Sequence, residues 1–259
     1  MPKIERYSHG TPSWTDLATT DDEGAVAFYS ALFGWKDNPV PMGPNAFYHM
    51  FELNGVSVSA MRVLEPAERE MGVPPHWTTY FSVDNVDEAT ERAAAAGGTV
   101  VMPCTDVFDA GRMSMVQDPQ GAYFALWQAK THIGSGLKNE PGTIGWTELM
   151  TSDLAAASSF YEKTLGVTSS KMGDMDYTLL NVGAESVAGA MGITAEMGPI
   201  PPHWATYFQV ASVRAAAEKA TGLGATVIAG PMEVPGVTWF AVLDDPQGGK
   251  FGIIGPENG

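Results

Sequence analysis

Apolar and polar residues alternate along the chain in an order that occurs twice. Trp14 to Thr19 read as a short strand, and a run with apolar residues at helical spacing follows until Gly34 ends it. The same pattern begins again at Trp146, 132 residues later (146 − 14), and ends at Gly166. Each half is therefore predicted to begin with a strand, a helix and a glycine stop.

Acidic residues before these runs predict where the two helices begin. Asp21 or Asp22 in the first half and Asp153 in the second are expected N-caps, because their side chains can accept backbone N–H groups of the first turn. The apolar faces of the helices are matched residue by residue: Ala25, Phe28, Tyr29, Leu32 and Phe33 in one, and Ala157, Phe160, Tyr161 and Leu165 in the other. These faces are predicted to be buried.

The rest of each half predicts further strands and a second helix. Helices are expected over 86–96 and 213–222, each ending at glycines. An Asp-Pro-Gln-Gly turn lies between the last two strands of each half, at Asp118 and again at Asp245, 127 residues later (245 − 118). The expected strands are 47–53, 56–63, 77–83, 112–117 and 123–128, then 177–182, 186–193, 204–210, 239–243 and 250–254.

Each half therefore contains two strand–helix–strand–strand–strand units. A duplication of this length is too long for a solenoid repeat and fits a domain. We expect an α+β protein of two tandem duplicated domains, over residues 8–129 and 143–256. Residues 130–142 carry the Gly, Ser, Asn and Pro residues of a linker.

Composition and charge narrow the classes of partner. The chain has 259 residues, 44% hydrophobic and 17% charged, which is typical of a globular protein. It has no apolar run near the roughly 18 residues of a membrane span and no apolar leader at its start, so a cytoplasmic protein is expected. Its net charge of −16 argues against nucleic acid and membrane partners. Cys104 is the single cysteine, which excludes an internal disulfide framework and a Cys-rich zinc site and predicts a small buried side chain.

In the order and spacing of these features, the chain resembles the vicinal oxygen chelate superfamily of glyoxalases, bleomycin resistance proteins and extradiol dioxygenases. The features are the opening strand with its capping Asp, the helix with Phe28-Tyr29 and Phe33-Gly34 or Phe160-Tyr161 and Leu165-Gly166, and the late Asp-Pro-x-Gly turn. The resemblance implies that the curved mixed sheet of each domain forms a half-barrel cavity, with the helices outside. The repeated Pro-Pro-His-Trp is similar to tandem actinobacterial members that are sometimes labelled hydroxylases.

The resemblance also implies where a metal would be bound. Active members carry a His early in the opening strand, a second His in a strand of the next unit and a Glu after the Asp-Pro-x-Gly turn. The first position falls at Trp14 or Trp146, the second at Thr78 or Ala205 and the third at Ala125 or Gly252. None of these six residues is a usual metal ligand, so neither a metal nor another cofactor is expected.

Four residues near these positions are candidates for acid–base work or for a displaced metal site. Asp16 and Glu148 lie two residues beyond the first position, and His76 and His203 lie two before the second, so each pair shares a strand face with it. The alternative is a structural role, in which the histidine fixes the turn after Pro-Pro and the carboxylate pairs with the histidine or with a backbone donor.

Five residues are candidate ligand-binding residues. Large rings can stack on a flat ligand or plug a cavity that no longer holds metal, and an arginine can hold a carboxylate or phosphate or form a surface ion pair. Arg112 aligns with Trp239, so the two halves are not chemically alike. The five are Trp14, Thr78, Arg112, Trp146 and Trp239.

Three classes of function follow. The first is a metal-free protein that binds a small apolar or aromatic metabolite or drug in its cavities. The second is a lyase, isomerase or hydroxylase-like enzyme on a small oxygenated metabolite, using His76 or His203 with Asp16 or Glu148, with or without a displaced metal. The third is a secreted or surface-exposed interaction protein. The duplication predicts a monomer with pseudo-twofold symmetry or a homodimer.

Overall fold

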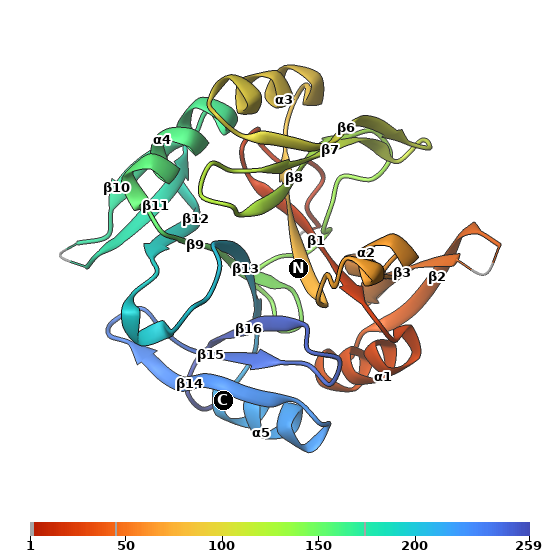
Figure 1. The fold of residues 1–259 in the computed structure, drawn as a ribbon. Coiled ribbons are helices and arrows are strands. Elements are labelled where there is room, and N and C mark those ends of the chain that lie inside the picture. Colours follow the sequence, from red (N-terminus) through yellow and green to blue (C-terminus); the bar gives the residue numbers. More distant parts are fainter. Residues whose placement is uncertain (1–2, 45, 174) are drawn as a thin grey trace.

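The computed structural model describes residues 3–44, 46–173 and 175–259. In this part of the chain each half forms one eight-stranded mixed sheet, and the longer helices lie outside the sheets (Figure 1). This confirms the expected α+β fold of two repeated domains with open, half-barrel sheets. None of the helices in the described ranges is long and apolar enough to cross a membrane.

In the described residues of the first half there are eight strands and three helices. They are β1 (Pro12–Thr19), α1 (Asp22–Phe33), β2 (Lys36–Gly43), β3 (Ala46–Leu53), β4 (Val56–Val63), α2 (Pro66–Glu70), β5 (His76–Ser82), α3 (Val86–Ala95), β6 (Thr99–Val107), β7 (Gly111–Gln117) and β8 (Tyr123–Ala129).

The second half repeats this order with a short 3-10 helix in place of α2. Its elements are β9 (Ile144–Thr151), α4 (Leu154–Leu165), β10 (Thr168–Lys171), β11 (Tyr177–Val182), β12 (Glu185–Gly192), the 3-10 helix Ala195–Met197, β13 (His203–Gln209), α5 (Val213–Gly222), β14 (Thr226–Val234), β15 (Thr238–Asp244) and β16 (Lys250–Gly255).

The two sheets have the same topology. The first has the order β2-β3-β4-β1-β5-β8-β7-β6, in which β1 is parallel to β4 and antiparallel to β5, and β5 is parallel to β8. The second follows the order β10-β11-β12-β9-β13-β16-β15-β14. The opening strand of each half is therefore central in its sheet, beside the strand that begins with the histidine of Pro-Pro-His-Trp.

Helices of one half pack against helices of the other half. α1 lies beside α5, and α3 lies beside α4 (Figure 1). One hydrophobic core joins Phe28 and Tyr29 of α1 to Phe208 and Phe251 of the second sheet. The other core joins α4 to β5, β8 and α3 of the first half in the same way. Each core is therefore built from the first unit of one half and the second unit of the other.

Two buried tyrosines connect the halves at their turns. Tyr29 Oη donates to Asp245 Oδ2 at 2.8 Å, and Tyr161 Oη donates to Asp118 Oδ2 at 2.9 Å. Each turn aspartate also accepts three backbone N–H groups of its own turn, as with Asp118 and residues 120–122. The Asp-Pro-Gln-Gly motif is thus both a turn and the partner of the opposite helix.

The helix boundaries agree with the sequence analysis, and four edge strands were missed. Asp21, not Asp22, is the N-cap of α1, and Gly34 ends it in the left-handed conformation with a φ of 75°. The missed strands are β2, β6, β10 and β14, which contain no buried residue and hence no buried apolar face to detect. Pro39 and Pro41 in β2 are compatible with an edge position because no neighbouring strand needs their missing N–H groups.

Candidate functional site

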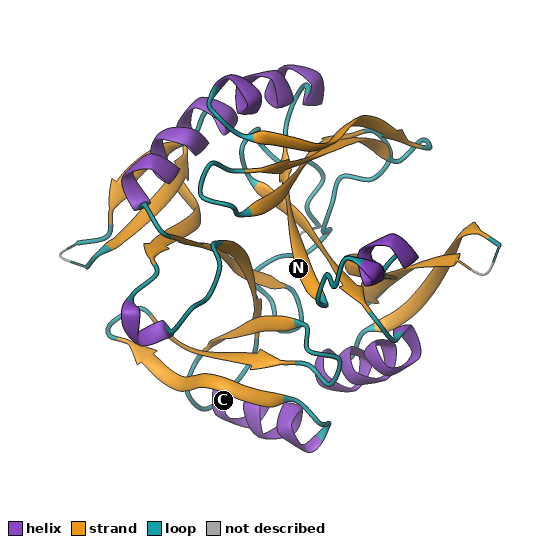
Figure 2. Cartoon of the chain, in the orientation of Figure 1, coloured by secondary structure: helices purple, strands orange, loops and turns teal. Residues whose placement is uncertain are grey.

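The inner face of each sheet faces away from the longer helices (Figure 2). This face carries a buried polar network. In the first half Asp16 on β1 is 3% exposed, and its Oδ2 accepts hydrogen bonds from the hydroxyls of Tyr48 and Tyr80, both at 2.8 Å. Trp14 Nε1 donates to Tyr48 Oη at 3.1 Å. Burial raises the pKa of Asp16, although the nearby Arg62 charge and the tyrosine hydroxyls oppose this shift.

The second half builds the same network from corresponding residues. Tyr177 Oη donates to Glu148 Oε2 at 2.7 Å, and Tyr207 Oη donates to Glu148 Oε1 at 3.1 Å. Trp146 Nε1 donates to Tyr177 Oη at 2.8 Å. Burial raises the pKa of Glu148, and the two tyrosine hydroxyls oppose it only in part. Among the described residues no charged side chain opposes this shift as Arg62 opposes that of Asp16.

A tyrosine occupies the space between the ligand positions that the family resemblance implies. In the sheet register Tyr207 pairs with Trp146 on one side and with Gly252 on the other. A Cβ atom at Gly252 would lie only 2.1 Å from Cδ1 of the Tyr207 ring. A glutamate at position 252 therefore has no room while Tyr207 keeps this conformation.

The donor set consequently does not fit the family's metal site. No carboxylate or imidazole is present at those positions, which are Trp14, Thr78 and Ala125 in one half and Trp146, Ala205 and Gly252 in the other. Among the described residues no group of three or more His, Cys, Asp or Glu side chains is arranged to hold a metal ion. The carboxylates that are present, Asp16 and Glu148, are instead bound by tyrosine hydroxyls.

His76 and His203 share the inner face with these networks, because they lie two residues before Thr78 and Ala205 on the same strands. His203 Nδ1 lies 2.8 Å from the carbonyl oxygen of Pro201, and His76 Nδ1 lies 2.9 Å from that of Pro74. A carbonyl oxygen only accepts, so Nδ1 carries the proton and Nε2 is left as an acceptor. Burial lowers the pKa of His203, which favours this neutral form.

The structure corrects the placement of two candidate ligand-binding residues. Arg112 lies on the helix side of its sheet, where it pairs with Asp87 of α3 at 2.9 Å and with Asp106 at 3.1 Å. Trp239 packs against the core that contains α5. Strand alternation explains both results, since the neighbouring Met113 and Phe240 take the inner face. Thr78 is buried beside Asp16 on that face.

The inner faces of the two halves differ in exposure. In the first half Trp14 and Trp127 are 4% and 5% exposed, and the His132 ring contacts both, at centroid distances of 4.6 and 5.9 Å. Ile254 occupies the position of Trp127 in the second half. On the inner face of that sheet Trp146 and five apolar side chains remain partly exposed: Leu179, Met191, Phe240, Val242 and Ile254.

The sequence analysis missed the tyrosines of both networks. Tyr80 and Tyr207 are 127 residues apart and lie on the same strand face as His76 and His203, which was a detectable signal. Tyr48 and Tyr177 were harder to relate, because the two halves differ in length between their first helix and Pro-Pro-His-Trp.

Comparison with known proteins gives a family and several relatives. The model of the glyoxalase/bleomycin resistance protein/dioxygenase superfamily matches residues 11–126 and 143–253. CFP32 of Mycobacterium tuberculosis (strain CDC 1551 / Oshkosh), which bears a provisional glyoxylase name, is 46% identical over 99% of this chain and 98% of its own. The anthracycline biosynthesis protein DnrV of Streptomyces peucetius is 34% identical over 97% of this chain and 95% of its own.

Solved structures show the same fold at low identity. The Mn(II)-bound glyoxalase from Novosphingobium aromaticivorans has a TM-score of 0.67 at 18% identity, covering 95% of this chain and 82% of that one. The 2,3-dioxygenase LapB from Pseudomonas sp. KL28 has a TM-score of 0.63 at 17% identity, covering 98% and 93%. At this identity the likeness concerns the fold alone.

Proposed function

The chain belongs to the glyoxalase/bleomycin resistance protein/dioxygenase superfamily, and from this premise we propose that it binds a small flat apolar molecule on the inner face of its second sheet. The observation that carries the proposal is the partly exposed apolar inner face that includes Trp146, together with the hydrogen bonds that join Trp146, Tyr177 and Glu148. Ligand sites commonly combine such a surface with a few convergent polar groups.

The polar base defines the chemistry of the ligand. The carboxyl group of Glu148 and the hydroxyl of Tyr177 can hydrogen-bond a carbonyl or hydroxyl oxygen at the edge of a ring, while Trp146 and Phe240 offer ring faces for stacking. A relative named for anthracycline biosynthesis supports a ligand of that chemical type. The first half, closed by Trp14, Trp127 and His132, has a structural role in this proposal.

Binding of flat oxygen-bearing probes tests the proposal. Menadione and alizarin are expected to bind the purified full-length chain, as measured by calorimetry and thermal shift. Trp146→Ala should weaken binding by about tenfold or more, since loss of a buried aromatic contact costs more than about 1 kcal/mol. Trp239→Phe, on the opposite face, serves as the matched control and should leave binding unchanged. Equal binding by wild type and Trp146→Ala would contradict the proposal.

A second candidate is acid–base catalysis on a bound oxygenated metabolite. It is favoured by the acceptor Nε2 of His203 together with the raised pKa of Glu148, since these are a neutral base and a carboxyl group that holds its proton to higher pH than an ordinary glutamate does. Isomerase or lyase chemistry would then begin with proton removal next to a carbonyl group. Incorporation of deuterium from heavy water into a carbonyl ligand, lost in His203→Ala and in Glu148→Gln, distinguishes this enzyme from a binding protein.

A further inference from the structure

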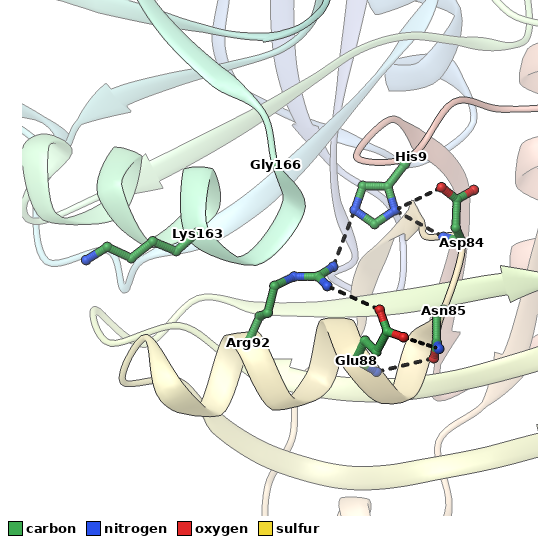
Figure 3. A pocket seen from close by; sticks show the side chains of 7 residues that line it. All are labelled: His9, Asp84, Asn85, Glu88, Arg92, Lys163 and Gly166. Carbon is green, nitrogen blue, oxygen red and sulfur yellow. Dashed lines mark hydrogen bonds and ion pairs between the residues drawn. The ribbon is translucent and has the colours of Figure 1, made fainter.

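A polar groove lies on the outside of the molecule, away from both inner faces. It has a volume of about 450 Å³ and lies between the start of α3 and the end of α4 (Figure 3). His9, which precedes β1, and Arg92 of α3 face each other across it, with Asp84 and Glu88 at its rim (Figure 3).

The hydrogen bonding of His9 places a proton on the side of its ring that faces Arg92. The backbone N–H of Asp84 donates to His9 Nδ1 at 3.0 Å, so Nδ1 is an acceptor and the neutral ring carries its proton on Nε2. Burial lowers the pKa of His9, and Arg92 acts in the same direction while Asp84 opposes it. His9 is therefore neutral, with a donor at Nε2.

Two donors consequently point at one another. Arg92 Nη2 lies 3.5 Å from His9 Nε2, and a guanidinium group has no acceptor. Arg92 Nε is used by the carbonyl oxygen of Thr164 at the end of α4, at 3.3 Å, and Nη1 lies 3.9 Å from Glu88 Oε2. The Nη2 group and the Nε2–H group thus converge on the groove, and within the described ranges neither has an acceptor at hydrogen-bond distance.

The duplication supplies an internal comparison. The corresponding groove between α1 and α5 has a volume of about 280 Å³ and keeps one interaction, in which Lys219 donates to the carbonyl oxygen of Leu32 at 3.1 Å, as Arg92 does to Thr164. Three of its other positions are apolar where the first groove is polar: Pro141 replaces His9, Ala211 replaces Asp84 and Ala215 replaces Glu88. The helices of the second groove therefore pack without the polar side chains, so the fold does not need those side chains in the first groove.

From this convergence we propose that the groove binds a small oxyanion, a carboxylate or a phosphate, with one oxygen bridging His9 Nε2–H and Arg92 Nη2. Charge-assisted bonds from a guanidinium group suit such an oxygen. Glu88 competes for Arg92 and repels the anion, so the affinity for a bare anion is weak. The site goes beyond the ligand proposed for the inner face and does not depend on it.

Nuclear magnetic resonance of the ¹⁵N-labelled full-length chain tests the site. Long-range ¹H–¹⁵N spectra should show His9 in the Nε2–H form. Titration with sodium acetate and, separately, sodium phosphate at constant ionic strength should shift His9 and Arg92 Nε saturably, with a Kd of about 1–10 mM for at least one anion. The tighter anion identifies the class of ligand, carboxylate or phosphoryl.

Three variants make the result specific. Arg92→Gln should weaken binding by about tenfold or more, whereas Glu88→Gln should strengthen it several-fold because it removes the competing carboxylate. Lys163→Gln, whose ammonium group points away from His9 in Figure 3, should change the affinity by less than about threefold. An Nδ1–H tautomer of His9, shifts that do not saturate with either anion, or weaker binding by Glu88→Gln would overturn the proposal.

Discussion

At the scale of single residues, the absence of a side chain at Gly252 lets Tyr207 reach Glu148. Because a Cβ atom there would lie 2.1 Å from the tyrosine ring, Gly252→Ala is expected to destabilise the protein by about 1–3 kcal/mol, the usual cost of overpacking. Urea denaturation measures this change in the free energy of unfolding. Gly192→Ala is the matched control, since no atom lies within 4 Å of a Cβ at that position.

A double-mutant cycle attributes the cost of Gly252→Ala to the ring. In a Tyr207→Ala background the space is open, so the further change Gly252→Ala should cost less than about 0.5 kcal/mol. An undiminished cost in that background would show that the ring of Tyr207 is not what the alanine contacts.

The buried Glu148 predicts a pH dependence of stability. Its folded-state pKa is raised above the ordinary 4.5, so the folded chain keeps a proton that the unfolded chain has already released. Stability is therefore lost as the pH rises from 4.5 through the folded-state pKa. Glu148→Gln lacks this loss, so its stability relative to wild type should rise with pH across that window. Glu91→Gln, at an exposed position of α3, should show no such rise.

Strand alternation predicted some residues of the candidate site and not others. It identified the face that carries Asp16, Glu148 and the two histidines, because side chains two apart share a face. It did not distinguish Trp146 on the inner face from Trp239 on the helix side, because alternation alone does not say which of the two faces of a strand is the inner one. The pairing of carboxylates with tyrosines depends on β3 and β11, whose register only the folded sheets define.

At the scale of elements, each core contains residues of both halves, because helices of one half pack against helices and strands of the other. Tyr29→Phe removes the hydroxyl that donates to Asp245 and accepts from Trp77 Nε1, and should cost about 1–3 kcal/mol because Asp245 stays buried. Hydrogen exchange should show the loss of protection in β16 of the other half, not in β8 of its own half. Tyr161→Phe is the reciprocal control and should affect β8.

The periodicity of the chain predicted the central strands and the helices but not the partners of the helices. The apolar face of α1, with Phe28 and Tyr29, shows that it is buried, yet periodicity carries no information on which sheet covers it. The duplication does not resolve the choice of partner, because α3 and α5 have similar apolar faces and either could pack against α1. Only the structure shows that α1 is paired with α5 of the other half.

At the scale of the whole molecule, the shared cores make the two halves interdependent despite their separate sheets. Each half supplies a first unit to one core and a second unit to the other, and Thr15 of β1 contacts Thr206 of β13 where the central strands meet, with their hydroxyl oxygens 3.1 Å apart. A chain cut in the linker near Lys138 would leave both fragments with exposed apolar faces.

We therefore expect neither residues 1–136 nor residues 137–259 to fold alone as a monomer. Each fragment should be unfolded or self-associated, because a second copy can supply the missing unit through the same pseudo-twofold arrangement. Mixing the two fragments should give a one-to-one complex with the circular dichroism spectrum of the intact chain, measured with light scattering for mass. If either fragment alone is a folded monomer, the cores do not require the packing of helices between the two halves.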